Sequence, residues 1–563
     1  MRLLIGYDLI EYNASASMEA DVTCELREAV DRILQSSSRK KLVVAGPGTG
    51  KTTLFRALLE AASGDQKTRL VLTFINNLKN DLEKSLSELA SIYTLHGYCQ
   101  GLLKRRSDLR AGLTKDFLCF PGLRSLIKVD WEYLKNEPAP QFIALMRSLV
   151  AGREIDFYLD RANYYDAVDF DDSVYRTYSE LKKDPSSMRG YELVLIDEYQ
   201  DFNRMEAAFI DLLAERSPIV VAGDDDQALY SQLRGASWEH IRSLYTSGDY
   251  EVFPLPFCMR CPEVIVGAVN DVIFRARQAE RLEGRIDKPY RHYEPVKGGD
   301  SRLYPKISLV TTTVQRLKAN YFGRYITQCI EQIPKEEIEE AKKKGDPAVL
   351  IIGSKQYRNQ IEAHLVEEGY TIDISRDRID GIERAQGLYI LKENPNSNLG
   401  WRIILEFEKE GFASACIRNA ASKGLPLNEV IPLEMKEVVL KEAQALPESK
   451  VEAQEKGDTD VELDIKVTSF EGAKGLSAQH VFIVGLHEGD LPRDKNNIQD
   501  IEICRFVVGL TRTKKKCSIL VTKRFADQWK KPSPFIFWVK RERYEEILVN
   551  ADYWKQLETD LVN

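Results

Sequence analysis

A glycine-rich segment between an apolar run and a helical pattern constrains this chain more than any other feature. The apolar run Leu42–Val44 leads into Ala45-Gly46-Pro47-Gly48-Thr49-Gly50-Lys51-Thr52, and leucines at helical spacing follow from Leu54. This pattern predicts a strand, a phosphate-binding loop and a helix, with alanine in place of the usual first glycine. In such a loop, backbone N–H groups and the helix N-terminus surround phosphate oxygens, Lys51 reaches the β- and γ-phosphates, and Thr52 holds Mg²⁺.

Apolar runs that alternate with helical patterns predict an α/β fold with parallel sheets. The alternation occurs in two regions, and residues 97–190 and 376–461 interrupt it, which predicts a mostly helical insertion in each of two sheet domains. The expected division is an N-terminal extension (1–22), a first core domain (23–96 and 191–275) with its insertion (97–190), a second core domain (276–375 and 462–540) with its short insertion (376–461), and a C-terminal tail (541–563). The charged run Lys335–Lys344 predicts a solvated helix.

Composition limits the classes of protein that the chain can belong to. The 563 residues carry a net charge of -8, so a nucleic-acid site would need a local basic groove rather than a basic protein. The nine scattered cysteines, the absence of a signal-peptide pattern and the lack of an apolar run near the roughly 20 residues of a membrane helix predict a cytoplasmic protein without membrane contact. Cys258 and Cys261 form the one C-x-x-C, and without a second pair neither a zinc nor a redox role is favoured.

Acidic side chains follow a second buried-type strand. The run Leu193–Ile196 ends at Asp197 and Glu198, where one carboxylate can hold Mg²⁺ and the next can orient or deprotonate the attacking water. The alternative is an exposed acidic turn. The run Asp197-Glu198-Tyr199-Gln200-Asp201 argues against this alternative. A third strand-like run ends near Gln227, which could sense a γ-phosphate.

The order of these segments resembles the UvrD/Rep-like superfamily 1 DNA helicases, over residues 24–540. The segments that carry the resemblance are AGPGTGKT (45–52), LTFINN (72–77), TLHGYC (94–99), IDEYQDFN (196–203), AGDDDQALYSQLRGA (222–236), LPFCMRCP (255–262), FEGAKGL (470–476), VVGLTRTKK (507–515) and KPSPFI (531–536). The resemblance implies two RecA-like domains with ATP and Mg²⁺ in the cleft between them.

The resemblance also implies roles for individual residues. Lys51, Thr52, Asp197 and Glu198 would bind and activate MgATP, Gln227 would couple the γ-phosphate to movement, and Arg260 and Arg512 would stabilise charge on the transferred phosphoryl group. The implied nucleotide-binding set is Ala45, Gly46, Pro47, Gly48, Thr49, Gly50, Lys51, Thr52, Thr53 and Gly475. For either arginine the alternative is a surface ion pair.

On the DNA side, the resemblance implies that Phe74, Tyr230 and His96 contact single-stranded DNA, with aromatic faces stacking on bases. Asn76, Thr94 and Arg234 would contact the DNA backbone or link the two sites. The alternatives are core packing for Phe74 and Tyr230 and a buried, satisfied histidine for His96.

The sequence departs from the family pattern mainly on the adenine side. Leu26 stands where the family has an adenine-reading glutamine, Thr53 replaces an arginine, and Met259 replaces a stacking tyrosine. Leu233 replaces the second aromatic of its segment, and Trp238 is a candidate to rebuild that platform. In the FEGAKGL segment, Glu471 replaces the usual histidine, and Ser477 replaces the glutamate that follows it.

The implied function is an ATP-driven, 3′→5′ single-stranded DNA translocase and helicase in repair, recombination or antiviral defence. Its substrate would be single-stranded DNA or DNA with a 3′ single-stranded tail. Two alternatives stay open: a nucleotide-gated clamp on DNA or a partner without processive unwinding, and a motor subunit that works with a separate nuclease or defence protein.

Overall fold

The computed structural model describes residues 16–230, 235–313, 321–374, 381–447, 463–526 and 528–560. The first of its two large sheets has six parallel strands in the order β3-β2-β6-β7-β1-β8. The strands are β1 (Lys40–Ala45), β2 (Arg69–Thr73), β3 (Ser91–Thr94), β6 (Leu193–Ile196), β7 (Ile219–Gly223) and β8 (Glu251–Leu255). The helices of this domain are α1 (Ala16–Gln35), α2 (Lys51–Ala61), α3 (Asn76–Leu86), α9 (Arg204–Arg216) and α11 (Trp238–Ser247). The central strands are buried throughout, because helices cover both faces of the sheet.

The second sheet has seven parallel strands in the order β13-β14-β12-β15-β16-β11-β19. They are β11 (Ile307–Thr312), β12 (Val349–Gly353), β13 (Ile372–Ile374), β14 (Ile465–Thr468), β15 (Ala478–Val484), β16 (Thr513–Thr522) and β19 (Tyr544–Val549). The helices around it are α12 (Glu263–Gln278), α13 (Glu294–Leu303), α14 (Tyr321–Glu331), α15 (Lys335–Lys344), α16 (Lys355–Glu367), α22 (Asp500–Leu510), α23 (Pro534–Trp538) and α24 (Ala551–Asp560). Two short pairs, β9 (Phe257–Cys258) with β10 (Arg291–His292) and β17 (Arg524–Phe525) with β18 (Gln528–Trp529), lie outside the large sheets.

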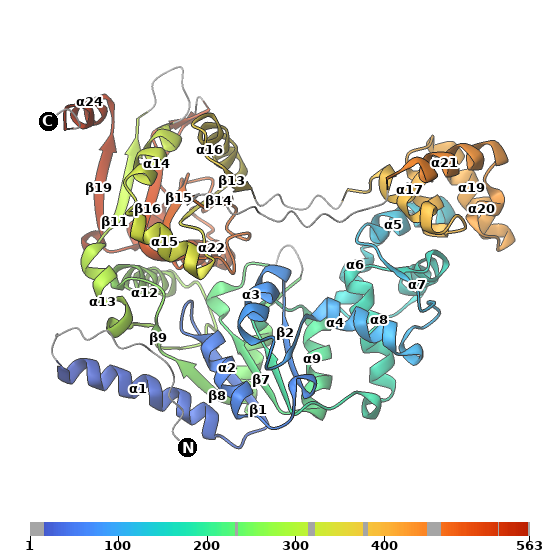
Figure 1. The fold of residues 1–563 in the computed structure, drawn as a ribbon, viewed down its shortest axis with the longest axis horizontal. Helices are drawn as coiled ribbons and strands as arrows, with labels where there is room; N and C mark the ends of the chain where they lie inside the picture. Colours follow the sequence, from blue (N-terminus) through green and yellow to red (C-terminus); the bar gives the residue numbers. More distant parts are fainter. Residues whose placement is uncertain are drawn as a thin grey trace.

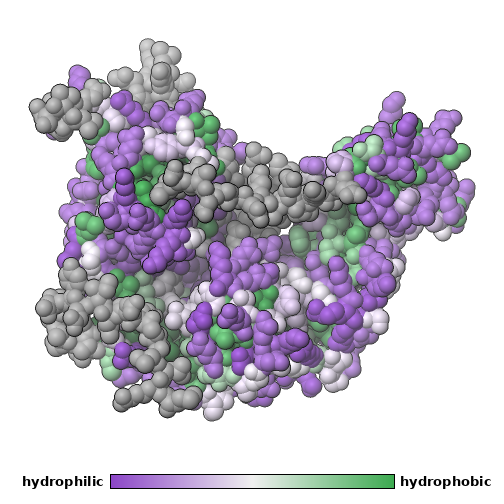
Figure 2. All heavy atoms as spheres, in the orientation of Figure 1, coloured by the Kyte–Doolittle hydropathy of each residue, from purple (hydrophilic) through white to green (hydrophobic). Residues whose placement is uncertain are grey.

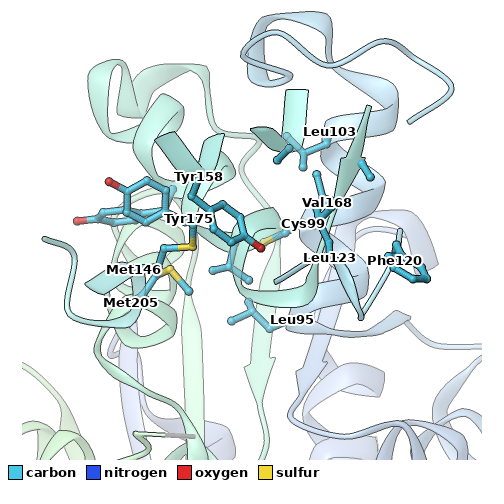
Figure 3. Close-up of a cluster of buried hydrophobic side chains, with 14 of the residues drawn as sticks. Leu95, Cys99, Leu103, Phe120, Leu123, Met146, Tyr158, Val168, Tyr175 and Met205 are labelled. Carbon is cyan, nitrogen blue, oxygen red and sulfur yellow. The ribbon is translucent and has the colours of Figure 1, made fainter. Parts of the chain in front are cut away.

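Both sheet domains carry a mostly helical insertion, so the predicted fold class is confirmed. The first insertion lies between β3 and β6 and contains α4 (Leu95–Arg105), α5 (Leu123–Lys135), α6 (Phe142–Arg147), α7 (Arg153–Tyr165), α8 (Phe170–Lys183) and the short strands β4 (Leu118–Cys119) and β5 (Ala167–Val168). Figure 3 shows part of its core, where Leu95 and Cys99 of α4, Tyr158 of α7 and Met205 of α9 come together. This insertion is therefore packed onto the first core domain.

The second insertion lies between β13 and β14 in the sequence. It consists of α17 (Arg384–Glu393), α18 (Asn398–Glu406), α19 (Glu410–Lys423), α20 (Leu427–Val430) and α21 (Leu433–Ala445). These helices stand beside α5 of the first insertion and away from their own sheet (Figure 1). Trp401 and Ile403 of α18 belong to the same hydrophobic cluster as the first insertion and the first core domain.

A buried charge cluster holds the two insertions together. Asp130 of α5 accepts hydrogen bonds from Arg161 of α7 (2.9 and 2.7 Å) and from Arg402 of α18 (2.7 Å), and both Asp130 and Arg402 are fully buried. The hydroxyl of Tyr164 donates to the carbonyl of Leu425 across the same interface. The second insertion is thus docked on the first through polar as well as apolar contacts.

The structure corrects three of the expected boundaries. The segment expected to be an N-terminal extension includes the start of α1. α12 shares its hydrophobic cluster with the second sheet, because its buried face (Val264, Ile265, Val272) packs there rather than on the first domain. The expected tail contains β19, which pairs with β11 and completes the second sheet.

The run Lys335–Lys344 forms α15, as the charge pattern predicts, although Glu337 and Ala341 on one side of this helix are buried. Over most of the face that Figure 2 presents, hydrophilic residues dominate. Among the described helices, none combines the length and apolarity needed to span a membrane.

Candidate nucleotide cleft and nucleic-acid surface

The glycine-rich segment forms a loop between β1 and α2. Gly48 and Gly50 adopt left-handed backbone conformations (φ 72° and 88°), and Gly50 is the N-cap of α2. A Cβ on Gly48 would lie 2.4 Å from Cβ of Arg260, so the loop passes too close to this segment for any side chain there. The hydroxyl of Thr49 donates to the carbonyl of Gly46 (2.9 Å), and this bond closes the turn. Loop and helix N-terminus together form the cradle that phosphate oxygens require.

Lys51 and the two acids after β6 lie side by side. The ammonium of Lys51 contacts Oε1 of Glu198 at 2.5 Å. Burial opposes ionisation of Glu198, but the charges of Lys51 and Lys474 outweigh it and hold the pKa of this carboxyl well below its ordinary value. Burial raises the pKa of Asp197 to about 6, against the opposing charge of Lys51.

Asp197 provides the test of whether these residues fit Mg²⁺. Its Oδ1 is buried and has no hydrogen-bond partner within the protein, which is costly for a carboxylate oxygen unless another ligand uses it. Carboxylate and hydroxyl oxygens are the ligands that Mg²⁺ prefers, and Thr52, the second residue of α2, lines the same cleft as Asp197. The donor set therefore fits Mg²⁺, with Asp197 and Thr52 as the residues that would hold it.

Lys474 of the second domain reaches into this cluster. Its ammonium pairs with Asp201, lies 3.4 Å from Oε2 of Glu198 and donates to the backbone carbonyl of Gln227 (2.8 Å). Only 2% of Lys474 is exposed. Burial disfavours its charge, yet the pKa of Lys474 is raised because Asp201 and Glu198 stabilise the ammonium.

Arg512 closes the cleft from the second domain. Its guanidinium donates to Oε1 of Gln227 (3.0 Å) and to the carbonyl of Leu476 (3.2 Å). Arg260 donates to the carbonyl of Thr511 (3.3 Å), beside Arg512. Burial and the neighbouring charge of Arg260 lower the pKa of Arg512 to about 10, so it stays protonated at neutral pH. Both arginines thus line the cleft that the phosphate loop also lines.

One cleft of about 910 Å³ collects most of the residues expected at the nucleotide site. Those that line it are Pro47, Gly48, Thr49, Gly50, Lys51, Thr52, Thr53, Asp197, Glu198, Gln227, Arg260, Gly475 and Arg512. Ala45 and Gly46 are buried beneath the loop and do not line the cleft. A Cβ on Gly475, whose φ is 84°, would lie 2.7 Å from Leu78 of α3, so the two domains are in close contact at this point.

Two of the residues that stand in place of the adenine-side residues expected from the resemblance lie at this cleft. Met259 lies next to the loop, with its Cε 2.4 Å from where a Cβ on Gly50 would be, and Thr53 lines the cleft. Tyr290 packs against Gly46, and its hydroxyl donates to the carbonyl of Pro47 (3.0 Å). Tyr290 therefore supports the loop from below.

The aromatic residues expected to contact DNA form a cluster between the domains. The ring of Phe74 lies 5.1 Å from that of Tyr230 and 5.7 Å from that of Phe202. Phe74 is only 3% exposed, so in this conformation its ring packs in the core rather than facing solvent. The hydroxyl of Tyr230 donates to the carbonyl of Glu471 (3.0 Å), which links the two domains directly.

The other expected DNA contacts lie at the start of α3 and α4. Thr94 is the N-cap of α4, and its hydroxyl accepts a hydrogen bond from the N–H of Gly97 (3.1 Å). His96 pairs with Glu206 of α9 (3.2 Å), and its ring meets the edge of Phe170. Asn76, the first residue of α3, is exposed.

Two residues of the expected DNA side, Arg234 and Leu233, lie outside the described residues. Trp238 opens α11, and the guanidinium of Arg242 lies 5.7 Å from its ring. The base-stacking role considered for Trp238 stays a prediction.

The structure adds residues to which sequence reasoning gave no role. Lys474 lies inside a quoted segment, so its position next to the glycines was a usable signal. The contact of Tyr290 with the phosphate loop could not be predicted, because Tyr290 belongs to no recognisable sequence motif. Trp529 on β18 is 79% exposed beside the exposed residues Lys523 and Lys531, and a Trp-Lys-Lys run was visible in the sequence.

Comparisons with known proteins agree with this arrangement. A family model described as an AAA domain matches residues 27–232. A probable DNA helicase II homolog of Mycoplasma genitalium is 21% identical, over 90% of this chain and 86% of that protein. The ATP-dependent DNA helicases PcrA of Staphylococcus epidermidis and Staphylococcus aureus are each 24% identical, over 69% of this chain.

The match to the PcrA proteins spans 56% of their length, little more than half. The phosphate loop, the acids after β6 and the arginine from the second sheet nevertheless meet in one cleft between two parallel-sheet domains. Together with the matched AAA domain, these features agree with the similarity of the chain to the DNA helicases among these relatives.

Proposed function

We propose that the chain is an ATP-hydrolysing motor that moves 3′→5′ along single-stranded DNA and separates DNA strands. The observation that carries the proposal is the hydrogen bond from Arg512 to Gln227. It places an arginine of the second domain beside the polar residues that end the strands of the first domain. A nucleotide in this cleft would therefore be enclosed by both domains, and its hydrolysis would change how they fit together.

Lys51 has a different partner once a nucleotide is present. In the structure the ammonium of Lys51 pairs with Oε1 of Glu198. This pairing keeps the carboxylate of Glu198 ionised, but it also prevents Oε1 from accepting a proton. The β- and γ-phosphates compete for the ammonium of Lys51, and its transfer to them frees one oxygen of Glu198 to accept a proton from water. Bound Mg²⁺, held by Asp197 and Thr52, would neutralise charge on the phosphates.

The remaining residues respond to the γ-phosphate. Arg512 and Arg260 stabilise the charge that develops on the transferred phosphoryl group, and Gln227 reports its presence through the bond to Arg512. Lys474 links the same centre to Tyr230, because its ammonium lies 5.8 Å from that ring. A change in position at the γ-phosphate would therefore be transmitted to the aromatic cluster through a single side chain, that of Lys474.

For the DNA track, we propose a path across both domains that uses Tyr230 and Phe74 on the first and Trp529 on the second. Phe74 must become accessible when the domains separate, since it is buried in the closed arrangement. Aromatic faces stack on any base, which suits a motor without sequence preference. Asn76, Thr94, His96 and Arg234 remain proposed contacts to the strand or links to the nucleotide.

The proposed substrate is single-stranded DNA or DNA with a 3′ single-stranded tail, and the proposed place of action is the cytoplasm. Repair, recombination and antiviral defence all fit such a motor, alone or with a separate nuclease or defence protein. The second candidate function, a nucleotide-gated clamp, is favoured by one observation. Met259 and Thr53 leave the base side of the cleft without the polar and stacking groups typical of the family.

Site variants test hydrolysis directly. Lys51→Ala removes the phosphate-binding charge and Glu198→Gln removes the candidate base, so each should lower ATP turnover by at least about a hundredfold. Glu198→Gln should still bind MgATP, as measured by a fluorescent ATP analogue. Lys67→Ala and Glu215→Gln are matched controls, because both side chains are exposed and neither lines the cleft. Near-normal turnover in a folded Lys51→Ala or Glu198→Gln variant would contradict the assignment.

A further inference from the structure

The turn where the chain passes between the two core domains carries the Cys-x-x-Cys pair. β9 ends at Cys258, and Cys261 lies two residues before the start of α12. Both side chains are fully buried. Arg260, one of the two arginines that line the cleft, lies between them in the sequence.

Each cysteine touches a different part of the nucleotide site. A Cβ on Gly48 would lie 3.2 Å from Sγ of Cys258, so this sulfur packs directly under the phosphate loop. The thiol of Cys261 donates to the carbonyl of Thr511 (3.6 Å), the same oxygen that accepts from Arg260. The pair therefore connects the loop of the first domain to the residue that precedes Arg512 in the second.

The two sulfurs are chemically unequal. The N–H of Cys261 donates to Sγ of Cys258 (3.4 Å). Burial disfavours a thiolate at Cys258, but hydrogen bonding within the turn, including the N–H of Cys261, outweighs burial and lowers the pKa of Cys258 to about 6. Burial raises the pKa of Cys261 well above its ordinary value. A thiolate next to a neutral thiol in a C-x-x-C turn is the arrangement found in dithiol redox pairs.

A metal site explains the pair less well. Structural zinc takes four ligands, and two cysteines supply only half of them. Among the described residues, one group of three or more potential ligands occurs, Asp224 to Asp226, and all three of these carboxylates are paired with Lys288. Formation of a disulfide between the two cysteines therefore explains the pair better than metal binding does.

We propose that Cys258 and Cys261 form a reversible disulfide that switches off nucleotide turnover. With hydrogen peroxide as oxidant, the thiolate of Cys258 attacks one peroxide oxygen, and the other leaves as hydroxide and is protonated to water. Cys261 then attacks the resulting sulfenic sulfur, loses its proton, and releases the second water as the S–S bond forms. Two thiols are oxidised, and one peroxide is reduced to two waters.

The disulfide would act on the site through one lost hydrogen bond and one change in the shape of the turn. The sulfur of Cys261 no longer donates to Thr511, and the turn that carries Arg260 is pulled into a tighter ring. Arg260 would then lose its position relative to the phosphate loop. Both sulfurs are buried in the closed arrangement, so oxidation requires the cleft to open, and a non-hydrolysable ATP analogue that closes the cleft should slow it.

The experiment treats the full chain with hydrogen peroxide and measures intact mass, the Cys258–Cys261 peptide and ATP turnover. We expect a mass loss of two hydrogen atoms within this peptide, at least about a tenfold drop in turnover, slower oxidation with the ATP analogue, and recovery with dithiothreitol. The effect on turnover rests on the proposed function, whereas the mass of the peptide does not, so failure of one can be told from failure of the other.

Variants separate this pair from the other cysteines. Cys261→Ala should no longer form the disulfide, so peroxide should not lower its turnover below that of the same untreated variant. Cys517→Ala, which removes another buried thiol, should respond to peroxide as the wild type does. Free thiols at Cys258 and Cys261 after treatment that oxidises the exposed Cys24 would overturn the proposal. So would a disulfide that forms without any change in turnover.

Discussion

Replacing Arg402 by alanine should release the second insertion from the first. The guanidinium of Arg402 is fully buried and donates to Asp130 (2.7 Å), to Glu406 (2.8 Å) and to the carbonyl of Leu126 (3.4 Å). Asp130 keeps Arg161 as a partner on its other oxygen, so the variant leaves one carboxylate oxygen unpaired rather than a whole charge.

The cost of this change follows from those contacts. Loss of a hydrogen bond to a charged group costs about 1.5–3 kcal/mol, and the space left by a long buried side chain adds to it. Removing one partner of a buried ion pair costs about 3–5 kcal/mol, and the retained Arg161 places this case near the lower end, at about 3 kcal/mol. The docking equilibrium should then shift roughly a hundredfold, since each 1.4 kcal/mol is tenfold.

Amide hydrogen exchange measures this shift, because it reports local opening separately from global unfolding. Amides of α17–α21 should exchange roughly a hundredfold faster in Arg402→Ala, while those of β1 and β7 are unchanged. Arg418→Ala is the matched control, because its exposed guanidinium donates to the carbonyl of Tyr133 at the same interface and should contribute less than about 1 kcal/mol. Wild-type exchange in α17–α21 of Arg402→Ala, or equal effects of the two variants, would refute the reasoning.

Three further predictions concern the base, pH and the DNA track. With Thr53 and Met259 at the base side, kcat/KM for ATP should exceed that for GTP only weakly, and a preference above about a thousandfold would show that other residues read the base. Burial lowers the pKa of His487 to about 4. Between about pH 6.5 and 4 the imidazole of His487 is therefore protonated in the unfolded chain and neutral in the folded chain. The free energy of unfolding should therefore fall by up to about 3 kcal/mol as pH drops through this window, and His487→Gln should remove that part of the slope. Trp529→Ala should weaken binding of single-stranded DNA by about 1–3 kcal/mol, measured by fluorescence anisotropy, with no change for Phe407→Ala, which removes an exposed aromatic of the second insertion.

The sequence predicted those parts of the fold that depend on local pattern. Apolar runs such as Leu193–Ile196 became buried parallel strands, and the phosphate loop followed from its glycines, which are adjacent in the chain. The sequence did not predict β19, because Glu545 and Glu546 interrupt its apolar residues and the segment resembles a tail. Its place in the sheet depends on pairing with β11, which is distant in the sequence. The assignment of α12 to the second domain depends on which sheet its apolar face packs against, and no local sequence pattern specifies this.

The site divides in the same way. Residues next to one another in a quoted segment, such as Asp197 and Glu198, were found from the sequence. The contact of Lys474 with Glu198 joins positions 276 residues apart and depends on how the two domains meet. The burial of Phe74 and the docking of Arg402 on Asp130 depend on tertiary packing as well.

The most direct test of the motor is ATP turnover with and without single-stranded DNA, for the wild type and Tyr230→Ala side by side. DNA should stimulate ATP turnover by the wild type at low salt, and this stimulation should fall as salt rises, since phosphate contacts dominate affinity. Tyr230→Ala should keep most of the turnover seen without DNA and lose the stimulation, because the ring that links the strand to Lys474 is gone. A wild-type protein that no single strand stimulates at low salt would contradict the motor and leave the nucleotide-gated clamp in its place.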